Sequence, residues 1–135
     1  TYCDQVVQEN LRINPAAPAF FKRSPEGRAT TLGSYEIPAS TDVFCSTWGL
    51  ARNPAVWDEP AKFDPSRWEP EKVAARHPFA SLPFSYGTRG CIGRQLSLIE
   101  QRMSLAHLVR RFAMRVDPSS DIKSSSWLII SMDIL

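Results

Sequence analysis

The sequence predicts a mainly α-helical fold with small β elements and long loops. Segment 2–13 and the segment from Gly93 to Phe112 carry apolar residues at spacings of three and four, which places them on one face of a helix. Between them, segments 32–38 and 42–48 alternate or run apolar, as short strands do. Eleven prolines in 135 residues, about 8% against a background of roughly 5%, indicate rigid loops rather than a tidy helical bundle.

The first helix is expected over Tyr2–Ile13, where Val7 and Leu11 lie near helical spacing. It should stop before Pro15, because a proline disfavours the helical conformation of the residue that precedes it. The chain starts at Thr1 within this helix, without Met and without an expected cap. We therefore expect further chain upstream and interpret the sequence as a C-terminal fragment.

The middle of the chain is expected to be largely loop. Residues 15–31 are punctuated by prolines and read as irregular, and segments 32–38 and 42–48 follow as a small β element. Asn53-Pro54 permits a short helical turn through Trp57. Most of residues 58–92 should be loop, because five more prolines fall there. Loops longer than about 12–15 residues inside a compact domain usually serve a function, so we expect this stretch to be a functional scaffold.

The helix that follows Gly93 has the strongest helical pattern in the chain. Its apolar residues form a wide face that we expect to be buried; they are Leu96, Leu98, Ile99, Met103, Leu105, Ala106, Val109 and Phe112. Beyond this helix, segments 114–116 and 127–132 are predicted strands, separated by a polar loop.

Charge, cysteine content and hydropathy exclude several classes of protein. The formal net charge is only +2, from 16 basic and 14 acidic residues, which does not indicate a nucleic-acid-binding protein. The three cysteines lie far apart without a Cys-x-x-Cys pair, so neither a zinc site nor a disulfide framework is expected. No apolar run reaches the roughly 18 residues that a membrane-spanning helix needs, and no signal-peptide pattern opens the chain.

Basic residues concentrate between Arg89 and Arg115, where six arginines face one acidic residue, Glu100. Arginines on a helix usually form a solvated polar face. A docking surface for an acidic protein partner is the second interpretation. Nucleic-acid binding is disfavoured, because these arginines share a helix with an apolar face and lack interleaved aromatic residues.

A glycine-rich loop with one cysteine precedes the second long helix. Glycines at 87, 90 and 93 surround Cys91 and let a flat, bulky group approach the backbone. Backbone N–H dipoles at a helix start favour a thiolate over a thiol. Arg89 could hold a carboxylate of a cofactor, and Phe84 could shield the sulfur. The alternative is an inert buried cysteine in a turn, which is how we interpret the other two cysteines.

Three short motifs resemble those of one enzyme family, the cytochrome P-450 monooxygenases. Phe84-x-x-Gly87-x-Arg89-x-Cys91-x-Gly93 is similar to the haem-binding signature, Glu9-x-x-Arg12 to the Glu-x-x-Arg pair upstream, and Pro65-x-Arg67-Trp68 to the Pro-x-Arg-aromatic motif between them. Their order and spacing agree with the family as well. The resemblance implies that residues 1–135 are the C-terminal, haem-binding part of a single cytochrome P-450 domain whose N-terminal part is missing.

By this resemblance, Cys91 is the axial thiolate ligand of the iron in haem b, iron protoporphyrin IX. Phe84, Gly87, Arg89 and Gly93 would surround the cofactor. No catalytic residue is expected in the chain beyond this ligand, because the oxygen-activating helix of the family lies upstream. His77 and His107 could in principle bind haem, but neither neighbours a Cys-x-x-Cys attachment site, so we interpret both as structural.

The same resemblance implies a structural charge cluster of Glu9, Arg12 and Arg67 that fixes the loop behind the haem site. The parent enzyme would be an oxidoreductase that inserts one oxygen atom from O2 into a small apolar substrate of the sterol, fatty acid or xenobiotic class. The fragment alone should be inactive. The alternative is a non-catalytic remnant or partial product that acts only as a binding module.

Two details favour the mitochondrial branch of the family. Arg67 is followed by Trp68, and Gly93 is followed by Arg94, although Gln95 stands where a second arginine is expected. The parent would then be associated with the mitochondrial inner membrane and take electrons from an acidic ferredoxin, with Arg94 and Arg102 as docking residues. In the alternative, an enzyme of the endoplasmic reticulum, a flavoprotein reductase is the electron donor.

Overall fold

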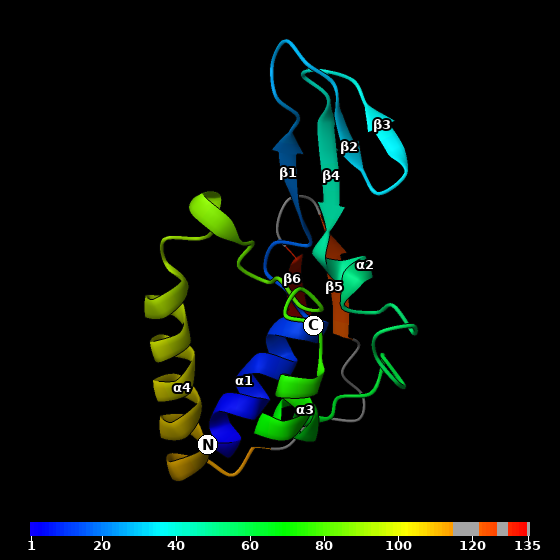
Figure 1. Ribbon diagram of the computed structural model, residues 1–135. Coiled ribbons are helices and arrows are strands. Elements are labelled where there is room, and N and C mark those ends of the chain that lie inside the picture. Colours follow the sequence, from blue (N-terminus) through cyan, green and yellow to red (C-terminus); the bar gives the residue numbers. More distant parts are fainter. Residues whose placement is uncertain (115–121, 127–129, 135) are drawn as a thin grey trace.

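The computed structural model describes residues 1–114, 122–126 and 130–134 (Figure 1). As predicted, the fold is mainly helical with small β elements. In chain order the elements are helix α1 (Tyr2–Ile13), strands β1 (Ala19–Arg23), β2 (Thr30–Leu32), β3 (Tyr35–Ile37) and β4 (Asp42–Ser46), helix α2 (Thr47–Leu50), 3-10 helix η1 (Pro65–Trp68), helix α3 (Pro70–Ala75), 3-10 helix η2 (Gly87–Arg89), helix α4 (Arg94–Arg111), and strands β5 (Ile122–Ser126) and β6 (Ile130–Ile134).

Helix α1 has the bounds that the sequence predicts. Contrary to expectation it is capped: the Thr1 hydroxyl accepts a hydrogen bond from the Asp4 N–H at 3.3 Å, and the Asp4 carboxylate accepts one from the Thr1 amine at 2.9 Å. Val7 and Leu11 are buried and pack against Leu98 of α4. The small apolar core therefore joins the two long helices (Figure 1).

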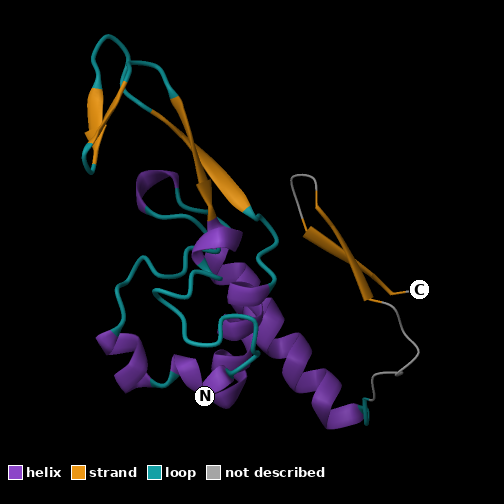
Figure 2. Cartoon of the chain, turned by 90° about the vertical axis from the view of Figure 1, so that its right-hand side faces the viewer, coloured by secondary structure: helices purple, strands orange, loops and turns teal. Residues whose placement is uncertain are grey.

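Strands β1 to β4 extend away from the helices as a narrow ribbon (Figures 1 and 2). Strands β1 and β4 pair antiparallel with Phe21 opposite Phe44, and β2 and β3 form a separate hairpin. Segment 32–38, predicted as one strand, belongs to this hairpin, whose turn contains Gly33 at φ +61°. The prediction of irregular structure over 19–23 was wrong, because β1 is stabilised by pairing with the distant β4.

The loop predicted over residues 58–92 contains three short helical elements, η1, α3 and η2. Proline stands at the first position of both η1 and α3, where its missing N–H has no helical partner to lose. The Asp64 carboxylate caps η1 by accepting a hydrogen bond from the Ser66 N–H at 3.0 Å. The prolines thus start short helices here rather than only breaking them.

Helix α4 follows Gly93 as predicted, but most of its apolar face is not covered by the described residues. Leu98 is buried against α1 and Leu105 packs beside it, whereas Leu96, Ile99, Met103, Val109 and Phe112 are exposed. The expected burial of the whole face is therefore wrong for this part of the chain, because α4 packs mainly against α1 among the described elements.

The C-terminal prediction was partly wrong. Strand β5 lies in the segment predicted as a polar loop, because its backbone pairs with β6 in register Ser124↔Met132. Of the predicted strands, residues 130–132 belong to β6, residue 114 is not in a strand, and residues 115–116 and 127–129 lie outside the described part of the chain. Within the described ranges, no helix has the length and apolar content to cross a membrane.

Candidate functional site

The loop before α4 folds back on itself and fixes the position of Cys91. The Cys91 N–H donates to the Phe84 carbonyl oxygen at 2.9 Å, and the Gly90 N–H donates to the Gly87 carbonyl oxygen at 2.9 Å. Helix α4 begins three residues after Cys91. Cys91 is exposed and forms no disulfide with the other described cysteines. The thiol is therefore accessible at the start of a long helix.

Two glycines are required by this loop geometry. Gly87 has φ +79°, a conformation that residues with a side chain rarely adopt. A Cβ added at Gly90 would lie 3.1 Å from the Gly87 carbonyl oxygen. At Gly93 a Cβ would lie 3.8 Å from the Cys91 sulfur, an ordinary contact distance. Gly87 and Gly90 thus fix the loop, whereas Gly93 leaves space beside the sulfur.

Cys91 opens onto a largely apolar cavity of about 310 Å³, here named the Cys91 cavity. Phe84 and Arg89 line it, as the sequence predicts for the cofactor site. Its remaining lining residues are Ala16, Ala17, Ala19, Phe20, Thr47, Leu82, Pro83 and Ser85. A thiol, a cation and apolar walls around one cavity fit the flat, mostly apolar haem that the resemblance implies.

The wall formed by residues 16–20 was not predicted from the sequence. The Thr47 hydroxyl donates to the Ala17 carbonyl oxygen at 2.7 Å and holds this segment against α2. The run of small residues between α1 and β1 was the available signal, since alanines let a bulky group approach closely. The position of this segment at the Cys91 cavity depends on the pairing of β1 with β4, which cannot be predicted from the local sequence.

Glu9 and Arg12 of α1 form an ion pair with no exposed surface on either side chain. Arg12 donates from Nε to Glu9 Oε2 at 2.9 Å and from Nη2 to Glu9 Oε1 at 2.8 Å. Its guanidinium also donates to the carbonyl oxygens of Ala51, Pro60 and Lys62, at 2.7, 2.8 and 3.2 Å. One side chain therefore anchors three points of the following loop.

Arg67 of η1 completes the predicted charge cluster, with its Nε 3.5 Å from Glu9 Oε1. Glu9 also accepts hydrogen bonds from the Asp64 N–H and from Trp68 Nε1, each at 2.9 Å. Burial alone would raise the pKa of the Glu9 carboxyl, but the hydrogen bonds from Arg12, Asp64 and Trp68 lower that pKa below its usual value. Glu9 is therefore held as a carboxylate. The structure brings Glu9, Arg12 and Arg67 together; the sequence did not indicate the bond from Trp68.

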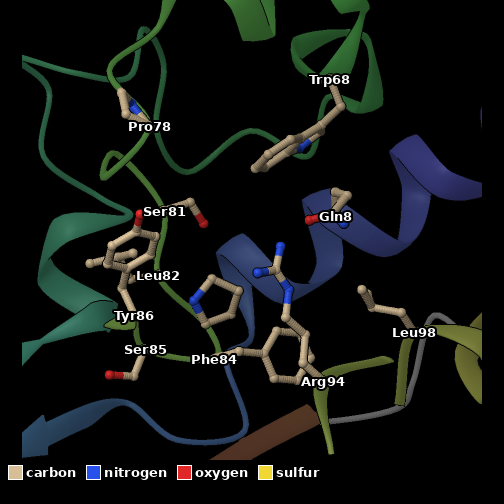
Figure 3. A pocket seen from close by; sticks show the side chains of 11 residues that line it. Gln8, Trp68, Pro78, Ser81, Leu82, Phe84, Ser85, Tyr86, Arg94 and Leu98 are labelled. Carbon is tan, nitrogen blue, oxygen red and sulfur yellow. The ribbon is translucent and has the colours of Figure 1, made fainter. Parts of the chain in front are cut away.

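The two arginines expected to dock a redox partner differ in their surroundings. Arg102 forms an ion pair with Asp4 of α1 and so already has an acidic partner within the chain. Arg94 reaches into a pocket of about 300 Å³ between α1 and the Cys91 loop, where Figure 3 shows it pointing toward Gln8. The pair therefore does not form one open basic surface.

The two histidines lie outside the lining of the Cys91 cavity. His77 Nδ1 accepts a hydrogen bond from the Phe79 N–H at 3.2 Å, and His107 lies within α4. Neither residue lines the Cys91 cavity. A haem in that cavity would meet the Cys91 sulfur rather than an imidazole.

Comparisons with known proteins agree with this architecture. The cytochrome P450 family model, written here cytochrome P-450, matches residues 1–132. Cytochrome P-450 4X1 of Homo sapiens is 35% identical over 130 residues, which cover 96% of this chain and 25% of that protein. Probable cytochrome P-450 6a13 of Drosophila melanogaster is 37% identical over 111 residues, which cover 82% of this chain and 22% of that protein.

A solved structure gives the same result. The crystal structure of the cytochrome P-450DA haem domain superposes with a TM-score of 0.89 at 30% identity, over 97% of this chain and 29% of that one. The chain spans about a quarter of the length of the curated relatives that it matches. None of these similarities supports the mitochondrial branch, since the relatives carry family 4 and family 6 names.

Proposed function

The chain belongs to the cytochrome P-450 family, and from this premise we propose that it is the C-terminal, haem-binding part of a monooxygenase in which Cys91 would hold the haem iron. The observation that carries the proposal is the shared cavity, which Cys91, Arg89 and Phe84 all line. When bound, haem b supplies the oxygen-activating chemistry of the family.

The residues of this chain have distinct roles in the proposal. Cys91 would hold the iron through its thiolate, and Arg89 would pair with a carboxylate of the cofactor. Phe84 limits the access of water to the sulfur, and Gly87 sets the backbone turn that presents it. Glu9, Arg12 and Arg67 hold the scaffold behind the loop. The rest of the catalytic machinery, including the helix that activates oxygen, belongs to the upstream part of the full-length protein.

We propose a small apolar substrate of the sterol, fatty acid or xenobiotic class. The family supports this class through its oxygen-activating haem chemistry; Ala16, Ala17 and Phe20 line the Cys91 cavity, which the proposal gives to the haem itself. The conversion would insert one oxygen atom of O2 into the substrate and reduce the other to water, with two electrons from a protein donor and two protons from solvent.

A flavoprotein reductase is the donor that we propose, in an enzyme associated with the membrane of the endoplasmic reticulum. The similarity to families 4 and 6 supports this choice over a mitochondrial ferredoxin. The ion pair of Arg102 with Asp4 agrees with it, because it removes one of the two cations expected to dock a ferredoxin. Stopped-flow reduction of the full-length protein by each donor tests the choice, and faster reduction by ferredoxin would contradict it.

The ligand assignment is tested by the ferrous-CO difference spectrum of the full-length protein. Thiolate ligation shifts the main haem band far to the red of a histidine-ligated haem. We expect this band in the wild type and its loss in Cys91→Ala. Cys45→Ala is the matched control and should retain the band. A red-shifted band in Cys91→Ala would refute the assignment, whereas a folded wild type without the band would be a non-catalytic remnant.

A further inference from the structure

We propose that Arg76 is a positioning residue that ties the segment leading to Cys91 to the buried charge cluster of Glu9, Arg12 and Arg67. The inference rests on the proposed role of Cys91 as haem ligand. It assigns a task to a side chain that belongs to none of the three motifs and does not line the Cys91 cavity.

Arg76 is held by two tryptophan rings and one main-chain carbonyl. Its Cζ lies 4.1 Å from the ring centroid of Trp57 and 5.3 Å from that of Trp68. Its Nη2 donates to the Arg67 carbonyl oxygen at 2.8 Å. The two rings lie next to each other, with centroids 5.8 Å apart. Trp57 is 1% exposed, so this contact forms part of a packed core.

Both of these contacts lead to the charge cluster. Trp68 donates from Nε1 to Glu9 Oε2 at 2.9 Å, and Trp57 has the Arg12 Cζ 5.0 Å from its ring centroid. The carbonyl that Arg76 binds belongs to Arg67, the third member of the cluster. A displacement of Arg76 would therefore act directly on Arg67, and on Glu9 and Arg12 through one tryptophan each.

Stacking and one main-chain hydrogen bond, rather than ion pairing, keep Arg76 in place. The cluster already has two cations for one anion, and Arg76 adds a third cation. Burial, together with the nearby Arg67 charge, lowers the pKa of the Arg76 guanidinium. A flat guanidinium can stack on an aromatic face, where the ring attracts its charge. An ammonium group at the same position could not stack in this way.

Arg76 is also the first residue of the segment that leads from α3 to the Cys91 loop. It ends α3, and eight residues later Phe84 accepts the hydrogen bond from the Cys91 N–H. Trp68 and Phe84 line opposite parts of the same pocket, as Figure 3 shows. Trp68, one of the two rings that hold Arg76, therefore borders the same pocket as the ring beside the cysteine. Arg76 thus fixes the start of this segment to the scaffold.

Haem retention is the property that tests this role, measured in the ferric full-length protein. We expect Arg76→Gln to release haem about tenfold faster, the order of magnitude of a lost, partly buried cation–aromatic contact. We also expect a smaller fraction of the red-shifted ferrous-CO band. Arg76→Lys should release haem at least about threefold faster, because the charge alone does not restore the stacking.

Arg52→Gln is the matched control. Arg52 stacks on Trp48 at 4.2 Å and donates from Nη2 to the Ile13 carbonyl oxygen at 2.7 Å, so it makes the same two kinds of contact. It contacts neither tryptophan of the Arg76 site. Its replacement should lower the urea midpoint of unfolding without a change in the fraction of the red-shifted band.

The outcomes separate a positioning role from a general contribution to stability. The proposal fails if Arg76→Gln lowers the urea midpoint but leaves haem release and the band fraction at wild-type values. It also fails if Arg76→Lys restores wild-type behaviour. If Arg76→Gln does not fold, Arg76→Lys decides by the same two measurements. Failure of the Cys91 assignment is distinct, because the wild type itself would then lack the red-shifted band.

Discussion

Replacement of Glu9 by glutamine keeps the shape of the side chain and removes the one negative charge of the buried cluster. The carboxylate accepts two hydrogen bonds from Arg12, one from the Asp64 N–H and one from Trp68 Nε1. Glutamine offers one acceptor oxygen, and its NH2 group would face donors. Loss of one partner of a buried ion pair costs about 3–5 kcal/mol.

We expect the lower end of that range, about 3 kcal/mol, because three main-chain carbonyls still accept hydrogen bonds from Arg12. The assay is urea unfolding of the full-length protein. With a slope of about 3 kcal/mol per M for a protein of this class, the midpoint should fall by about 1 M. A midpoint within a few tenths of a molar of the wild type would refute the reasoning.

Asp42→Asn is the control for the loss of a carboxylate that binds arginine. Asp42 accepts hydrogen bonds from Arg23 Nε and Nη2 at 2.8 and 2.9 Å, and its geometry resembles that of Glu9 with Arg12. Both side chains of this pair are exposed, and solvent screens such pairs. Its replacement should leave the midpoint unchanged. If both substitutions lowered the urea midpoint equally, burial would not determine how much such a carboxylate contributes to the free energy of unfolding.

Three further predictions concern pH and the Cys91 loop. The pKa of Glu9 is lowered in the folded state from its ordinary value of 4.5. Its contribution to the free energy of unfolding is therefore fully present above that pH and is lost as the pH falls through the folded pKa. Glu9→Gln should flatten the acid limb of a plot of stability against pH, and an unchanged limb would contradict this. Ser85 has φ +59° and a buried hydroxyl without a partner among the described residues, so Ser85→Gly should raise the free energy of unfolding by about 1 kcal/mol, and a loss of stability would count against strain there. Gly87→Ala should lower it by about 1–2 kcal/mol because φ is +79°, and a neutral result in the same urea titration would show that the turn adapts.

The two long helices could be predicted because their signals are local. Apolar spacing and the proline after α1 give its bounds, and the glycine before α4 gives its start. The same periodicity indicates that α4 has an apolar face, but it does not indicate which element covers that face. The burial of Leu96 and Ile99 was therefore wrongly expected. Local pattern determines an element, whereas burial depends on its neighbours.

The features that the sequence did not reveal depend on contacts between distant residues. Strand β1 exists because it pairs with β4, and the alanines beside it reach the Cys91 cavity through the same pairing. No pattern in the sequence distinguishes Arg76 from other arginines, and its contacts with Trp57 and Trp68 depend on the tertiary structure. Motif spacing indicated Glu9, Arg12 and Arg67 because a family resemblance supplied the tertiary information.

The hydrogen bonds from Arg12 to the carbonyl oxygens of residues 51, 60 and 62 restrict the length of this region in evolution more than its composition. Every residue type has a main-chain carbonyl, so an exposed position such as Lys62 can change its side chain without losing the bond. An insertion or deletion between residues 52 and 61 would instead shift the carbonyls away from Arg12. We therefore expect homologues to differ in the composition of this loop while keeping its length.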